Sequence, residues 1–350
     1  MNYPKNNFDC LRLAAAVMVL VSHQYVLMGR TEYGIGGRLS FGSLAVCIFF
    51  VISGYLITQS WIRDPHLFRF LVRRWLRIWP ALAVVTCIAA CVVGPYVSTL
   101  GFKDYYSSPQ FQGFFKSLRL TTVAFELPGV FENNPFPRAV NGSLWTIPLE
   151  VRWYLVLAVA GVCGVLRRRW LALAAFLSLA AYHFGIYRAE TNPVHHWSNQ
   201  YGLFFLSGAL LQLFRDVWSE RRMAVGALCI LFGGIGALAG HSMLAMLIGL
   251  PGPIIFIGES STPVLRSFGR GGDISYGAYI YAFLVQQTLV WKLGVQGPFA
   301  WHLLASLLVT GLCAWLSWHL VEKRALALKS VRPRFAWLKT RLTGSVDPAV

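Results

Sequence analysis

Long apolar stretches recur along this chain, and short polar segments separate them. Ten stretches stand out, at residues 11–28, 40–62, 76–98, 143–166, 170–186, 201–214, 223–239, 243–257, 274–293 and 300–321. A helix of about 20 residues crosses a hydrocarbon layer about 30 Å thick, so this pattern predicts transmembrane helices. Glycines blur the boundary inside 223–257, which leaves nine or eleven spans as alternatives.

We therefore expect an all-α fold, a polytopic transmembrane helical bundle of about ten spans. Residues 1–330 are predicted to form one membrane domain, and residues 331–350 a basic, mobile cytoplasmic tail. The composition agrees, because 56% of the residues are hydrophobic and only 13% are charged, against about one quarter charged in soluble domains. The longest outer loop, about 99–142, is rich in aromatic residues and is expected to fold against the outer surface.

The positive charges indicate an orientation. With the N-terminus in the cytoplasm and ten spans, 22 of the 31 Lys and Arg residues lie inside, eight lie outside and Arg152 lies within a span. This asymmetry follows the positive-inside rule and places both termini in the cytoplasm. A net charge of +17 also suits nucleic-acid binding, but the basic residues do not gather on one patch or arm, so we expect no nucleic-acid partner.

Two ionisable residues lie in the first predicted span. Arg12 and His23 are eleven residues apart, which places them about 16 Å apart along a helix and within about 20° of the same face. Ionisable groups inside a membrane are costly, so each is a functional candidate. The alternatives are a snorkelling arginine at the cytoplasmic boundary and a histidine hydrogen-bonded between helices.

A second pair lies in the fourth predicted span. Glu150 and Arg152 are two positions apart, so they point to different sides of the helix and each needs a partner elsewhere. We expect Glu150 to face Arg12, His23 or another basic group across the bundle, because a lone carboxylate in lipid would be protonated. A purely structural salt bridge is the alternative.

Arginines are concentrated in the segment FLVRRWLRIWP at the start of the third span. Helical spacing places Arg69, Arg73 and Arg77 on one stripe, with Arg74 three residues before Arg77. Guanidinium groups suit bidentate phosphate binding, so this stripe can hold a phosphorylated cofactor. The alternative partners are the anionic headgroups of membrane lipids.

Other polar residues carry weaker signals. His195 and His196 are adjacent, without the spacing or the companion ligands of a metal site, so we expect no metal. The seven cysteines include no CxxC pair and are expected to pack as small apolar residues. Ser53 and Gly54 are interpreted as small residues that permit close helix packing rather than as a nucleophile.

Several ordered segments of the chain resemble one family. FDCLRLAAAVMVLVSHQ, FFVISGYLIT, RRWLRIWP, NGSLWTIPLEVRWYL, ISYGAYIYAFLVQQ and WHLVEKRA resemble, in this order, segments of the acyltransferase family 3 proteins, the membrane O-acyltransferases of bacterial surface glycans. Each string is short and largely apolar, but their joint order spans nearly the whole chain. One departure is Val151, which follows Glu150 where the family often has a second acidic residue.

The resemblance implies an acyl donor, usually acetyl-CoA, used from the cytosolic side, and an acceptor hydroxyl at or beyond the membrane. It marks His23 as the catalytic histidine, Arg12 as its companion, Arg74 and Arg77 as the RxxR pair and Glu150 as the carboxylate of the SLW segment. Histidine titrates in the range needed to take a proton from a sugar hydroxyl, which agrees with this role. Arg12 can stabilise charge that develops on the thioester oxygen.

The function expected from the sequence is therefore that of an O-acetyltransferase in a bacterial inner membrane. Its acceptor would be a surface polysaccharide or a lipid-linked glycan precursor. Acylation of a small molecule or a lipid is an alternative within the enzymes. A secondary transporter or flippase is an alternative of another class, because intramembrane Arg, His and Glu suit transport as well, although no internal repeat is visible.

Overall fold

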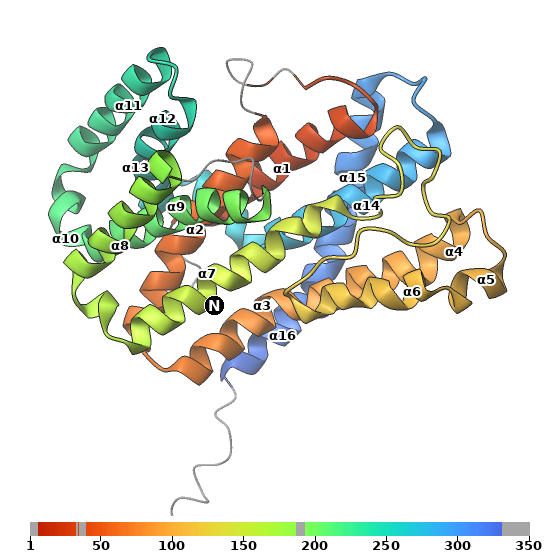
Figure 1. Cartoon of the computed structure of the whole chain (residues 1–350), viewed down its shortest axis with the longest axis horizontal. Helices are drawn as coiled ribbons and strands as arrows, with labels where there is room; N and C mark the ends of the chain where they lie inside the picture. The colour runs from red at the N-terminus through yellow and green to blue at the C-terminus, as the bar shows by residue number, and fades with distance from the viewer. Residues whose placement is uncertain (1–5, 33, 35–39, 187–192, 331–350) are drawn as a thin grey trace, which may run out of the picture.

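The computed structural model describes residues 6–32, 34, 40–186 and 193–330 of the chain. Within these ranges every regular element is a helix, so the predicted all-α class is confirmed. Figure 1 shows the helices gathered into one elongated bundle. The tail predicted at 331–350 and the side chain of His195 lie outside the described residues.

Helices of very different length make up the bundle. The first half contains α1 (Phe8–Leu27), α2 (Phe41–Arg63), α3 (Leu67–Ile88), α4 (Gly94–Val97), α5 (Phe102–Ser107), α6 (Pro109–Phe114) and α7 (Ile147–Val162). The second half contains α8 (Arg169–Ala181), α9 (Pro193–Leu213), α10 (Arg215–Trp218), α11 (Arg222–Leu238), α12 (Ser242–Gly249), α13 (Pro251–Glu259), α14 (Ser275–Leu293), α15 (Phe299–Ser317) and α16 (Lys323–Ala327). Short π-helical segments continue α3, α8 and α15, at Ala89–Val93, Tyr182–Ile186 and Trp318–Glu322.

Within the described residues, seven helical segments are long and apolar enough to cross a membrane. They are Phe8–Leu27, Phe41–Arg63, Leu67–Val97, Gly142–Val162, Arg215–Leu238, Ser242–Glu259 and Phe299–Ala327. The predicted stretches at 170–186, 201–214 and 274–293 are also helical, as α8 with its π-helical end, α9 and α14, but they fall outside this set. The number of ten spans and the cytoplasmic location of the termini therefore stay predictions.

Outward-facing apolar side chains mark the surface that a membrane would cover. On α11 the side chain of Ile230 is 62% exposed, and on α15 those of Trp301 and Leu308 are 67% and 66% exposed. Side chains of this size on a water-facing surface would be costly, and lipid removes that cost. Figure 1 shows α11 and α12 as a hairpin at one side of the bundle.

The helices α1 and α14 lie side by side and run in the same direction. At their first turns, Arg12 on α1 lies 3.3 Å from Asp273, two residues before α14 begins. Further along, the amide of Gln286 donates to the Leu20 carbonyl and to Gln24 Oε1, both at 2.8 Å. These buried polar contacts fix the register of two of the helices that line the candidate site.

Backbone contact joins α2 to α9. A Cβ atom at Gly54 would come within 1.8 Å of the Phe205 carbonyl oxygen, and one at Gly208 within 2.1 Å of the Val51 carbonyl oxygen. Only glycine permits so close an approach, so the packing role predicted for Gly54 is confirmed. This close crossing fixes the position of α2 and therefore that of Ser53, the residue before Gly54.

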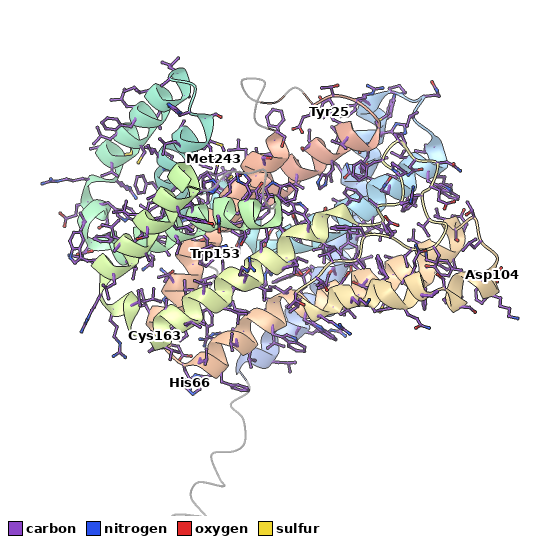
Figure 2. All side chains as sticks on the ribbon, in the orientation of Figure 1. Tyr25, His66, Asp104, Trp153, Cys163 and Met243 are labelled. Carbon is purple, nitrogen blue, oxygen red and sulfur yellow. The ribbon has the colours of Figure 1, made fainter. Side chains whose placement is uncertain are left out.

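The helix α7 completes the centre of the bundle. Trp153, labelled in Figure 2, lies on α7, and its indole nitrogen donates to the Ser198 carbonyl of α9 at 3.0 Å. At the far end of α7 a Cβ at Gly161 would meet the indole of Trp61 on α2, so α7 and α2 run in the same direction. Figure 2 places Cys163 and His66 at this same end of the molecule.

The aromatic loop between α4 and α7 is folded, as its composition predicts. Its helices α5 and α6 lie beside α3 and α4 (Figure 1), where the Tyr105 hydroxyl donates to the Ala90 carbonyl at 2.7 Å. Trp79 of α3 donates to the Leu118 carbonyl of the same loop at 3.2 Å. The loop thus packs along the side of α3 and α4 before it returns to α7.

Candidate active site

A cavity of about 240 Å³ lies between α1, α2, α3, α7 and α14. Its lining combines three arginines, one carboxyl group and three tyrosines, and the Arg77 guanidinium lies 5.5 Å from the Tyr276 ring. The polar residues that line it are Arg12, Ser53, Arg74, Arg77, Thr146, Glu150, Tyr154, Ser275, Tyr276 and Tyr279. The structure therefore brings four of the six predicted site residues, Arg12, Arg74, Arg77 and Glu150, to one cavity from three helices, α1, α3 and α7.

Carboxylates already neutralise two of the cavity's arginines. Arg12 pairs with Asp9 at 2.5 Å and with Asp273 at 3.3 Å. Arg77 pairs with Asp273 at 2.5 Å and with Glu322 at 3.5 Å. Asp273 thus bridges the first and third helices, and Arg77 joins this bridge to the end of α15.

The bridge decides the charge state of Asp273. Burial raises the pKa of this carboxyl group, but Arg12 and Arg77 lower it by more, so that the pKa of Asp273 lies well below its usual range. Asp273 is therefore ionised at neutral pH, and its charge holds the two guanidinium groups near each other.

Arg74 differs from its neighbours in having no ion pair within the described parts of the chain. Its guanidinium lies 5.9 Å from the Phe70 ring, and its buried Nε atom has no hydrogen-bond partner among the described residues. A buried polar atom without a partner is costly. Arg74 is thus the arginine of the cavity whose charge is available to an anionic ligand.

The other two arginines of the predicted stripe bind a loop residue. Arg69 and Arg73 both pair with Asp64, at 2.5 and 2.6 Å, just before α3 begins. Hydrogen bonds from Arg69 and Arg73 lower the pKa of Asp64 well below its usual range. Arg73 therefore turns toward Asp64, and it is absent from the residues that line the cavity.

Glu150 sits in the first turn of α7 and has partners that the sequence did not indicate. Its Oε1 atom accepts a hydrogen bond from the Tyr154 hydroxyl and another from Ser53 Oγ at 3.3 Å. Hydroxyl groups and the positive end of the α7 dipole contact the carboxyl group directly. The charge of Arg74 also acts on Glu150, without an ion-pair contact between the two described side chains. Ser53, interpreted as a packing residue, thus contacts the site.

Arg152 points away from this cavity. Its guanidinium donates to the Ser198 hydroxyl of α9 at 3.1 Å, so the partner it needs lies on the other side of α7.

His23 lies beyond the end of the cavity formed by Thr146 and Tyr279 and does not line it. There the hydroxyl groups of Thr146 and Tyr279 are hydrogen-bonded at 2.8 Å. Phe283, one turn further along α14, meets the half-buried His23 ring edge-on, with the ring centroids 5.1 Å apart. The buried Nδ1 atom of His23 has no hydrogen-bond partner among the described residues.

Four residues of this region were missed in the sequence. Glu322 follows the last predicted span by one position, and Asp273 precedes another by one, so neither counted as intramembrane. Ser53 lies on another helix, so its contact with Glu150 depends on the fold. Tyr154 follows Glu150 by four residues on the same helix, a spacing that could have indicated the contact. The WHLVEKRA and ISYGAYIYAF segments carried a partial signal, because they contain or adjoin the two acidic residues.

Comparison with known proteins assigns the chain to a class. The sequence profile of the acyltransferase domain family, acyltransferase family 3, matches residues 5–319. The chain therefore belongs to this family and is an acyltransferase. With its seven apolar helices it is a multi-pass membrane protein.

The similar proteins include an O-acetyl transferase of Shigella phage Sf6, 31% identical over 94% of this chain and 98% of its own length. Nodulation protein 10 of Rhizobium leguminosarum bv. viciae is 29% identical over 93% of this chain and 94% of its own. The putative peptidoglycan O-acetyltransferase YrhL of Bacillus subtilis (strain 168) is 27% identical over 81% of this chain and 50% of its own. No solved structure shows a significant match.

Proposed function

We propose that this protein transfers an acetyl group from acetyl-CoA, bound from the cytoplasmic side of the inner membrane, to a hydroxyl group of a surface polysaccharide or its lipid-linked precursor. The observation that carries the proposal is the cavity, in which the unpaired Arg74 lies with Glu150 and Tyr154, with His23 beyond its outer end. The names of two relatives, both O-acetyl transferases, support the acetyl group.

The residues present fit the donor. Acetyl-CoA supplies an activated thioester and carries phosphate groups, and the buried Nε of Arg74 without a partner suits such an anion. In this proposal Arg74 holds the phosphates, while Arg77 and its carboxylates keep the helices around the cavity together. Arg73, engaged by Asp64, takes no direct part.

The chemistry of the acceptor falls to His23. A sugar hydroxyl is a weak nucleophile at neutral pH, and an imidazole nitrogen that takes its proton contributes about 10² to 10⁴ in rate. The edge contact with Phe283 holds the His23 ring in place. No hydrogen bond from the described residues occupies its Nδ1 atom, so this atom can accept the proton. Arg12 and Glu150 line the path between the donor end and this base.

Purified protein in detergent tests the proposal. With labelled acetyl-CoA and de-O-acetylated surface polysaccharide, the wild type should transfer label to the glycan. His23→Ala should abolish transfer while the protein still folds and binds the donor, because the proton acceptor alone is lost. Full transfer by this variant would refute the role of His23, and label on lipid or on a small molecule would redirect the acceptor.

A further inference from the structure

A closed loop lies beside the aromatic contact of His23. The Arg138 N–H donates to the Phe131 carbonyl at 3.1 Å, which closes residues 131–138 at their base. Phe131 and Arg138 both have left-handed backbones, with φ of 55° and 62°. Such a conformation costs about 1–3 kcal/mol in a residue other than glycine, and it is typical of functional sites.

Buried amides fix this loop to α14. The side chain of Gln287 donates to the carbonyls of Phe136 and Ala139, each at 2.8 Å. Asn134 in turn donates to Gln287 Oε1 at 2.7 Å. Gln287 is fully buried and Asn134 nearly so, and their hydrogen bonds hold the loop in one conformation.

The loop nevertheless presents an aromatic ring outward. Phe136 is 40% exposed, and its ring lies 6.1 Å from that of Phe283, which in turn contacts His23. Gly142 makes room for this arrangement, because a Cβ there would come within 2.5 Å of the Phe283 ring. One row of rings thus connects the loop surface with the histidine.

Polar side chains surround the exposed ring. Asn133 and Arg138 of the same loop are exposed, while Glu132 accepts a hydrogen bond from Thr99 at 3.0 Å. Aromatic side chains with a few polar groups beside them are the residues that usually contact small-molecule ligands. It suits a sugar ring, whose C–H face is apolar and whose edge carries hydroxyl groups.

We propose that the loop Phe131–Arg138 binds the glycan acceptor, with Phe136 as the surface on which the sugar ring stacks before its hydroxyl group reaches His23. This inference rests on the proposed function and adds the residues that select the acceptor. Asn133 and Arg138 hydrogen-bond the sugar hydroxyls, and Gln287 acts as a positioning residue that keeps the ring in place.

The test compares Phe136→Ala with Phe102→Ala. Phe102 lies on α5 of the same outer segment and is 75% exposed, and its ring contacts Tyr106 rather than the His23 row. The assay measures acetyl transfer from acetyl-CoA to oligosaccharides cut from the de-O-acetylated surface polysaccharide. Phe136→Ala should raise the KM for the oligosaccharide about tenfold and leave the KM for acetyl-CoA within about twofold. Phe136→Trp should restore the value, and Phe102→Ala should match the wild type.

Two results would overturn the inference while the proposed function stands. One is an unchanged oligosaccharide KM in Phe136→Ala. The other is an equal loss of thermal stability in both variants without a change in KM, which would make Phe136 a lipid anchor. A wild-type protein that transfers acetyl to no glycan would instead refute the proposed function itself.

Discussion

Arg74→Ala tests donor binding without disturbing the ion pairs that hold the helices around the cavity together. Arg74 lines the cavity without an ion pair among the described residues, whereas Arg77 is tied to Asp273 and Glu322. Removing the Arg74 guanidinium therefore breaks no ion pair in the described structure. The effect should appear in the binding of an anionic donor and not in the stability of the fold.

The size of the effect follows from the contacts that one guanidinium can make. A hydrogen bond to a charged group contributes about 1.5–3 kcal/mol, and each 1.4 kcal/mol is about a tenfold change in affinity. Arg74→Ala should therefore raise the KM for acetyl-CoA by about 10-fold to 100-fold. Arg74→Lys should recover part of this loss, because a lysine keeps the charge without the planar fork.

Release of free CoA, followed with a thiol reagent over a range of acetyl-CoA concentrations, provides the assay. The matched control is Arg69→Ala, an arginine on the same helix that pairs with Asp64 outside the cavity. Its KM should stay within about twofold of the wild type, because Asp64 keeps its second arginine. An equal rise in both variants, or no rise in Arg74→Ala, would refute the assignment of Arg74 to the donor.

Three further substitutions test the surroundings of the cavity. Tyr154→Phe removes the hydroxyl that donates to Glu150. In steady-state kinetics it should lower kcat about tenfold with little change in either KM. An unchanged kcat would exclude a role of the Tyr154 hydroxyl in positioning Glu150. Gly54→Ala should destabilise the protein by about 3 kcal/mol or more in thermal unfolding, because its Cβ would overlap a backbone carbonyl of α9, whereas Gly311→Ala, with open space around it, should be neutral. Asp273→Asn should cost about 3 kcal/mol, because two guanidinium groups lose their shared carboxylate. The folded pKa of Asp273 is depressed, so this loss should be constant from about pH 5 to 8 and shrink below about pH 4, where the unfolded carboxyl group becomes protonated; a loss that grows in acid would contradict the bridge.

The hydrophobic pattern predicted the fold class because each long helix carries its own apolar stretch. The boundary between α11 and α12, blurred by glycines in the sequence, lies at Ala239–His241 in the structure. The π-helical ends of α3, α8 and α15 were not predictable, because no pattern of residues in the sequence marks them. Tertiary contacts accompany them instead, such as the hydrogen bond from the Tyr105 hydroxyl to the Ala90 carbonyl.

The candidate site was predictable where single residues violate the apolar pattern. Arg12 and Glu150 were found in this way, and Arg74 and Arg77 were found from the helical spacing of an arginine-rich segment. All four line one cavity. Partners on other parts of the chain, such as Asp273 and Ser53, were not predictable, because these contacts depend on the rotation of each helix about its axis. Asp9 and Tyr154 lie three and four residues from Arg12 and Glu150 on the same helix, so helical spacing could have indicated them.

The proposed acceptor loop was the least predictable part. The loop Phe131–Arg138 has no regular period, and its place beside Phe283 depends on the side chain of Gln287. A buried glutamine within an apolar stretch is in retrospect the local signal, because a buried amide needs partners.

The mass of the surface polysaccharide tests the central claim most directly. Cells that make the wild-type protein, cells that lack it and cells that make His23→Ala at equal protein level should be compared by mass spectrometry of the isolated polysaccharide. Loss of the protein and His23→Ala should both lower the mass by about 42 Da for each modified unit, the mass added when an acetyl group replaces a hydroxyl proton. A polysaccharide of the same mass in all three strains would contradict it.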